Sequence, residues 1–194
     1  MKRAAMLYCA DIDAPRYKVL KQRRQLPFVA NDDAEAEGGD GKWADYSLDD
    51  AFRLRLMLDL IGGESTDETQ LNGLGPSYAQ SIVYNAMSRF PRHPLNQIEP
   101  RDWWAGLIVL EDNNADEGVF RFSEWYVGEL EHLDAWVKEK ATRPCAGPNA
   151  SVTTRNLPVV RIFMVNVSRV ATIVRRRAEE LGLPEAEDFS EVPR

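Results

Sequence analysis

Apolar positions in the first 25 residues recur at the spacing of two short helices. Residues 4–10 form an apolar run that suits a packed helix, and Asp13 is a favourable N-cap for a second helix over residues 14–24. One face of this second helix is apolar, and its residues are Ala14, Tyr17 and Leu20. We therefore expect two helices joined by a short turn, with the cationic faces of the second helix exposed.

Helical spacing continues to about residue 90. Ser47 is a suitable cap for a helix over residues 48–61, which Gly62 and Gly63 end. Residues 65–68 (Ser-Thr-Asp-Glu) indicate the start of a short further helix. The Gly-Pro-Ser sequence at 75–77 precedes an amphipathic helix over residues 78–90, which the prolines that follow bring to an end.

The pattern changes from helix to strand after a polar stretch at 91–101 that three prolines interrupt. Residues 103–111 and 119–126 are rich in β-branched and aromatic residues, and the polar cluster at 112–118 between them is typical of a turn. The sequence therefore predicts a β-hairpin. We expect a domain boundary at the polar stretch, with one domain over residues 1–92 and a second over 101–194.

The remainder of the second domain predicts two helices and one more strand. Residues 127–141 have helical spacing, residues 143–150 have the Pro and Gly content of a loop, and residues 159–167 form a buried-strand candidate. Ser168 is the expected cap of a last helix that runs to Leu181. The predicted fold class is α+β, in which a helical N-terminal domain precedes a small domain made of a hairpin, a further strand and two helices.

Composition excludes several classes of protein. An apolar fraction of 44% in 194 residues is sufficient for packed cores. No apolar run approaches the ~18 residues of a membrane span, and the N-terminus lacks the features of a secretory signal, so we expect a cytoplasmic protein with no membrane partner. Cys9, Cys145, His93 and His132 lack ligand spacing, and we expect neither a metal nor a cofactor.

Catalytic motifs are missing as well. The chain has no nucleophile elbow, phosphate-binding loop or dinucleotide fingerprint, and neither histidine lies beside a suitable acid or nucleophile in the sequence. We therefore expect that the protein is not an enzyme.

The distribution of charge changes the meaning of the net charge. A formal charge of -7 argues against nucleic acid as a partner, because phosphate binding depends on positive potential. Residues 1–25, however, contain seven Lys or Arg and only two Asp, whereas residues 31–40 contain five acidic residues. The positive potential is thus concentrated on the two N-terminal helices.

The order of these features resembles the winged helix-turn-helix of the MerR family, over residues 1–72 with gaps. Residues 29–42, which are polar, Gly-rich and acidic, take the place of an expanded wing tip. The matching positions are Ile12, Ala14, Leu26-Pro27, Lys18, Tyr46-Ser47, Asp49-Asp50 and Leu54-Arg55. The chain departs from the family at the wing arginine, which falls on Ala44, at its aromatic neighbour, Trp43, and at the helix-ending glycine, Arg24.

This resemblance implies a sequence-specific DNA-binding transcriptional regulator whose partner is double-stranded DNA. Its second helix would enter the major groove, and its wing would touch the backbone or the minor groove. The implied contact residues are Arg3, Arg16, Tyr17, Lys18, Lys21, Arg23, Arg24, Lys42, Trp43 and Tyr46.

Two alternatives remain open. The same winged module occurs in excisionase-like and phage-packaging adaptors, where it places a protein partner on DNA. A winged module that has lost DNA affinity and binds protein is the other alternative, motivated by Ala44 and the acidic wing.

The C-terminal half is expected to mediate self-association or partner binding. The family's long dimerisation helix has no counterpart here, so we expect a homodimer formed through the α+β half. Six aromatic residues could line a ligand pocket or, as is more usual, form core and interface: Trp103, Trp104, Phe120, Phe122, Trp125 and Tyr126. The run Arg175-Arg176-Arg177 is either a second nucleic-acid patch or the exposed side of the last helix.

Overall fold

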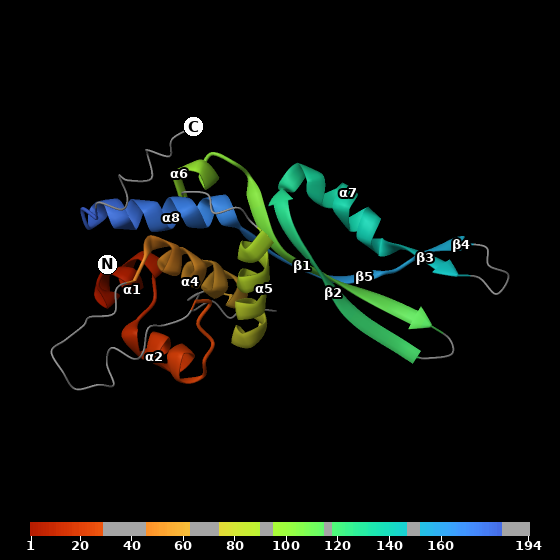
Figure 1. Ribbon diagram of the computed structural model, residues 1–194, viewed down its shortest axis with the longest axis horizontal. Helices are drawn as coiled ribbons and strands as arrows, with labels where there is room; N and C mark the ends of the chain where they lie inside the picture. Colours follow the sequence, from red (N-terminus) through yellow and green to blue (C-terminus); the bar gives the residue numbers. More distant parts are fainter. Residues whose placement is uncertain (29–45, 63–73, 90–94, 115–117, 147–151, 184–194) are drawn as a thin grey trace.

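The computed structural model describes residues 1–28, 46–62, 74–89, 95–114, 118–146 and 152–183. Most helices gather at one end of the molecule, and long antiparallel strands extend away from them (Figure 1). Helix α5 lies between the helical group and the sheet, where it contacts both α4 and strands β1 and β2. The mixture of helices with an antiparallel sheet confirms an α+β fold class.

The first half of the chain is helical, as its spacing predicts. Its described helices are α1 (Arg3–Ala10), α2 (Ala14–Gln22), α4 (Leu48–Ile61), α5 (Pro76–Arg89) and the short α6 (Leu95–Ile98). The expected wing at residues 29–42 and the short helix at 65–68 lie outside the described residues.

The helix boundaries follow local hydrogen-bonding signals. The Asp13 carboxylate accepts a hydrogen bond of 2.7 Å from the Arg16 amide, which confirms Asp13 as the N-cap of α2. Ser47 and Asp50 form a reciprocal capping box at the start of α4. Gly62 ends α4 in the left-handed region, with φ of 104°, where a glycine is favoured.

A three-stranded antiparallel sheet has the order β2-β1-β5. Strands β1 (Trp103–Asn114) and β2 (Gly118–Glu129) form the expected hairpin, and β5 (Val159–Asn166) is the expected further strand. Gly106 on β1 allows β5 to approach, because a Cβ at this position would lie only 1.9 Å from the Phe163 carbonyl oxygen.

Two sequence-based boundaries in this half are wrong. The helix expected from residue 127 begins three residues later, as α7 (Leu130–Ala141), because residues 127–129 pair with residues 103–105 of β1. The loop expected at 143–150 is replaced at its start by a strand, β3 (Thr142–Ala146), which pairs antiparallel with β4 (Val152–Asn156). Pro144 is compatible with β3 because the strand has a neighbour on one side only in this two-stranded sheet.

The cap of the last helix is also different from the expectation. Helix α8 spans Val167–Glu180, and its N-cap is Asn166, whose side chain accepts a 2.7 Å hydrogen bond from the Arg169 amide. Ser168 is instead buried: its hydroxyl donates to the Ile98 carbonyl at 2.9 Å and accepts from the Trp103 amide at 3.1 Å. It therefore joins α6, β1 and α8 in the interior.

One hydrophobic cluster extends across the expected domain boundary. It contains residues of α1, α2, α4 and α5 together with residues of β1, β5 and α8. Phe52 on α4, Leu107 on β1 and Val174 on α8 have no exposed surface. The division at residues 92–101 stays a prediction, while the core of the described residues is continuous across that point.

The opposite face of the sheet is covered by α7. A smaller cluster forms there from Ile108, Leu110 and Leu157, with Trp136 of α7 packed against it. Alternate residues of β1 thus serve two cores, as the period of a strand requires. Among the described helices, none combines the length and apolar composition needed to cross a lipid bilayer.

The buried hydroxyl of Ser168 generates a testable prediction. Ser168→Ala should lower the free energy of unfolding by about 2 kcal/mol, because the Ile98 carbonyl and the Trp103 amide would lose a buried partner. Thr172→Ala is the matched control: its hydroxyl bonds only to the Ser168 carbonyl one turn earlier, and we expect a change below about 0.5 kcal/mol. Urea denaturation would measure both, and equal losses would contradict a bridging role for Ser168.

Candidate nucleic-acid interface

Helices α1 and α2 are joined by a turn of three residues, Asp11–Asp13. Asp11 adopts the left-handed conformation, with φ of 57°, and its amide donates to the Tyr8 carbonyl while the Ile12 amide donates to the Leu7 carbonyl. These paired hydrogen bonds are those of a Schellman motif, which ends α1 and directs the chain into α2. The expected short turn between two helices is therefore present.

A groove of about 560 Å³ lies between the two helices. Its described lining combines an apolar floor with three cationic side chains that come from both helices. The lining residues are Arg3, Leu7, Ala14, Tyr17, Lys18, Lys21 and Gln22. Four of the predicted contact residues, Arg3, Tyr17, Lys18 and Lys21, thus line one concave surface.

Exposed cationic side chains occur on α2 and directly after it. Lys18, Arg23 and Arg24 are exposed, and no ion pair joins any of them to another residue in the described part of the chain. Arg16 is half-buried in the first turn of α2. Exposed cations on α2 and at its exit produce local positive potential although the whole chain is acidic.

Two tyrosines predicted to contact DNA are core residues. The side chains of Tyr17 and Tyr46 are only 3% and 6% exposed, and their hydroxyls lie 3.0 Å apart. Their rings meet edge to face, and the ring of Phe28 packs on Tyr46 in the same way. Their burial leaves almost no side-chain surface for a duplex, so their role as contacts stays a prediction, while their packing in the core is observed.

Lys42 and Trp43, the predicted contact residues of the wing, lie outside the described residues.

Arg24 occupies an unusual backbone conformation at the exit of α2. Its φ is 55°, in the left-handed region, and a second Schellman motif surrounds it: the Arg24 amide donates to the Lys21 carbonyl, and the Gln25 amide donates to the Leu20 carbonyl. Glycine is the usual residue here, because a side chain in this region costs about 1 kcal/mol. Arg24 is the position at which the sequence comparison expected a helix-ending glycine, and its backbone conformation is one that glycine favours.

Side chains of α5, which is distant in sequence, form hydrogen bonds with the residues that follow α2. The Gln80 side-chain amide donates to the carbonyls of Arg24 at 3.2 Å and Leu26 at 2.7 Å, and the Gln25 side chain donates to the Ser77 hydroxyl at 2.8 Å. Sequence reasoning missed Gln80, since nothing in its local pattern indicates a partner more than fifty residues away.

Each arginine of the run at residues 175–177 on α8 forms an ion pair with a carboxylate of the protein. Arg175 pairs with Glu99 and Glu179, and Arg176 lies 3.7 Å from Glu180. Arg177 pairs with Asp11 of the turn at 2.7 Å. This pairing favours the reading of a structural helix face over that of a second nucleic-acid patch.

Tyr8 and Asp59, which lie near these ion pairs, have shifted pKa values. A hydrogen bond to Glu180 raises the pKa of the Tyr8 hydroxyl. Burial raises the pKa of the Asp59 carboxyl, an effect that the neighbouring Arg55 guanidinium opposes.

Other parts of the surface are less suited to an anion. A groove of about 490 Å³ between α4 and α5 contains Asp49 and Asp50 as well as Arg53, which pairs with Asp49. Of the six aromatic residues considered for a pocket, Trp103 and Tyr126 are buried in the core and Phe120 is half exposed.

One group among the described residues has side chains that could hold a metal ion. Glu129, Glu131 and His132 bring one ligand atom each to within 4.8 Å of one another at the start of α7, and both glutamates lie within three positions of His132 in the sequence, where no ligand spacing was expected from the sequence. Glu131 and His132 are exposed. The cluster is on the opposite half of the molecule from the basic groove.

Comparisons with family models, with characterised proteins and with solved structures gave no match for this chain.

The strained exit of α2 leads to a second prediction. Arg24→Gly should raise the free energy of unfolding by about 0.5–1 kcal/mol, because relief of the left-handed strain exceeds the added entropy of the unfolded chain. The control is Arg23→Gly, at a neighbouring residue with an ordinary φ of -85°, where glycine should destabilise the protein by a similar amount. Chemical denaturation measures both, and a loss of stability in both variants would show that the backbone at Arg24 is unstrained.

Proposed function

We propose that this protein is a sequence-specific, DNA-binding transcriptional regulator in which α1, the turn and α2 form a MerR-like helix-turn-helix. The observation that carries the proposal is the placement of Arg3, Lys18 and Lys21 around one groove between the helices, with Arg23 and Arg24 exposed at the exit of α2. The protein has no catalytic role of its own in this proposal.

Helix α2 is the proposed recognition helix. Its exposed cations suit the electronegative major groove, where Arg and Lys donate to guanine edges and to phosphates. Its buried residues, Tyr17 and Leu20, anchor it to the core. A helix anchored through these two side chains can present its charged side to a duplex.

The C-terminal half is proposed to form the homodimer. Strands β2 and β5 are the two edges of the sheet, and each carries exposed apolar side chains: Val119 and Phe120 on β2, Val160 and Ile162 on β5. A dimer would read two half-sites related by its own two-fold axis, so its operator should be pseudo-palindromic.

The same apolar edges favour a second candidate. In an excisionase-like or packaging-type adaptor, they would hold a different protein and place it on DNA. Co-purification of a recombinase or packaging subunit, or an assembly larger than a dimer, would favour this alternative over transcriptional regulation.

The proposal is tested by fluorescence anisotropy with a randomised duplex pool over a salt series. The wild type should enrich a pseudo-palindromic site, and Lys18→Ala should weaken binding about five-fold while reducing the salt slope by about one phosphate contact. Lys138→Ala is the control, because Lys138 is an exposed cation of α7 paired with Asp134. Failure of the wild type to bind any duplex at low salt would overturn the proposal and leave a protein-binding winged module as the remaining reading.

A further inference from the structure

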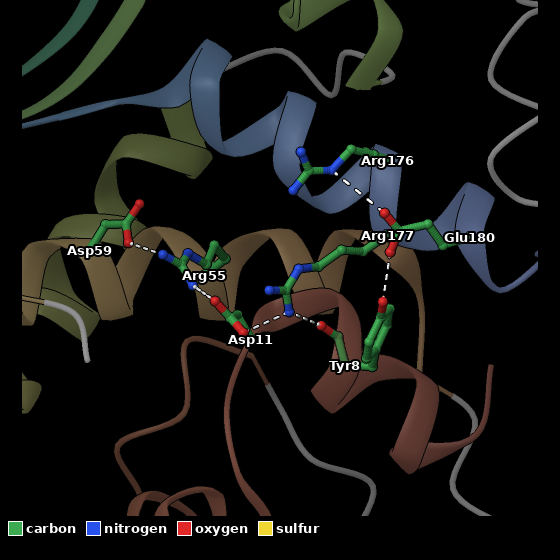
Figure 2. Close-up of polar contacts among 7 residues, drawn as sticks. All are labelled: Tyr8, Asp11, Arg55, Asp59, Arg176, Arg177 and Glu180. Atoms are coloured by element: carbon green, nitrogen blue, oxygen red, sulfur yellow. Dashed lines mark hydrogen bonds and ion pairs between the residues drawn. The ribbon is translucent and has the colours of Figure 1, made fainter. Parts of the chain in front are cut away.

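The turn between α1 and α2 is held by arginines from two other helices. The Asp11 carboxylate accepts from the Arg55 Nη1 of α4 at 2.8 Å and from the Arg177 Nη1 of α8 at 2.7 Å (Figure 2). Each carboxylate oxygen thus has its own guanidinium partner. Charge-assisted hydrogen bonds of this kind are among the stronger polar contacts in proteins.

Arg177 also reaches the end of α1 directly. Its Nη1 donates to the Tyr8 carbonyl at 2.8 Å, and its guanidinium carbon lies 5.2 Å from the centre of the Tyr8 ring. The Tyr8 hydroxyl in turn donates to Glu180, one turn further along α8, at 2.6 Å. Helix α8 therefore contacts both the main chain and the side chain of the last turn of α1.

Arg55 is the more buried member of the network. Its side chain is 17% exposed and pairs with Asp59 of the same helix at 2.9 Å as well as with Asp11. Loss of Asp11 would leave this guanidinium with a single carboxylate partner. The carboxylate of the turn is thus matched to charges on both neighbouring helices.

Helix α2 depends on this turn for its placement. Only Tyr17 and Leu20 of its nine residues are buried. Its start follows directly from the turn, and its end is held at the Arg24 and Leu26 carbonyls by Gln80. Tyr17 and Leu20 thus anchor α2 to the core, and polar contacts with other helices hold the segments at its two ends.

We infer that Asp11 and Arg177 are positioning residues through which α8, an element of the C-terminal half, sets the orientation of the proposed recognition helix. This inference rests on the proposed function. Because β5 leads directly into α8, an event on the sheet that shifts α8 would act on the turn and thereby on duplex affinity. Neither residue touches the duplex in this arrangement.

The test compares Arg177→Gln with Arg176→Gln. Both variants remove one guanidinium from α8, but Arg176 is 66% exposed and, within the described part of the chain, forms an ion pair with Glu180 alone. Hydrogen exchange of the free protein provides the first readout. We expect the amides of residues 14–22 to exchange about five-fold faster in Arg177→Gln than in the wild type, with the core amides of α4 unchanged and Arg176→Gln like the wild type.

Duplex binding provides the second readout. Arg177→Gln should lower the affinity for the selected site with an unchanged salt slope, because no phosphate contact is lost. Asp11→Asn should give the same result, and the double variant should lose less than the sum of the two. Thermal unfolding of each variant verifies that the protein is folded.

Three outcomes would overturn the inference. The first is equal exchange in α2 for Arg177→Gln and Arg176→Gln. The second is additivity of the effects of Arg177→Gln and Asp11→Asn on duplex affinity. The third is a lower salt slope for Arg177→Gln, which would make Arg177 a direct phosphate contact. If the wild type binds no duplex, the proposed function fails, and the exchange comparison still decides whether α8 orients α2.

Discussion

The packing of α8 against α1 and α4 is the constraint on which the rest of the structure depends. Val170, Ala171, Val174 and Ala178 form an apolar face with 1% exposure or less. Burial of this face brings α8 against α1 and forms one core from elements of both halves. Because β5 runs directly into α8, the same packing also determines where the sheet lies relative to the helices.

The cationic side chains around this apolar contact have two different roles. Arg175, Arg176 and Arg177 of α8 and Arg53 and Arg55 of α4 are paired with carboxylates, including that of Asp11, so they contribute to the fold. The exposed side chains of Lys18, Arg23 and Arg24 have no such partners within the described residues. This division explains how an acidic protein can present a basic surface.

Both ends of α2 are bordered by residues in left-handed conformations, Asp11 and Arg24. Aspartate is one of the few residues other than glycine that adopt this conformation readily, whereas arginine is not, so local preference opposes the conformation at Arg24. Each is held by side chains from distant helices: Arg55 and Arg177 at Asp11, and Gln80 at the Arg24 carbonyl. Local strain supported by long-range contacts is common where a protein positions a functional element.

The sequence by itself determined the elements whose signals are local. Asp13, Ser47 and Gly62 bound their helices through hydrogen bonds that span four residues or fewer, so a pattern a few residues long predicts them. The hairpin and the cationic faces of α2 were readable for the same reason. Only the tertiary structure decided the contact between the Tyr17 and Tyr46 hydroxyls, the bridging role of Ser168 and the contact of Arg177 with Tyr8, 169 positions away. These depend on which surfaces the apolar core brings together, and that is a property of the whole chain.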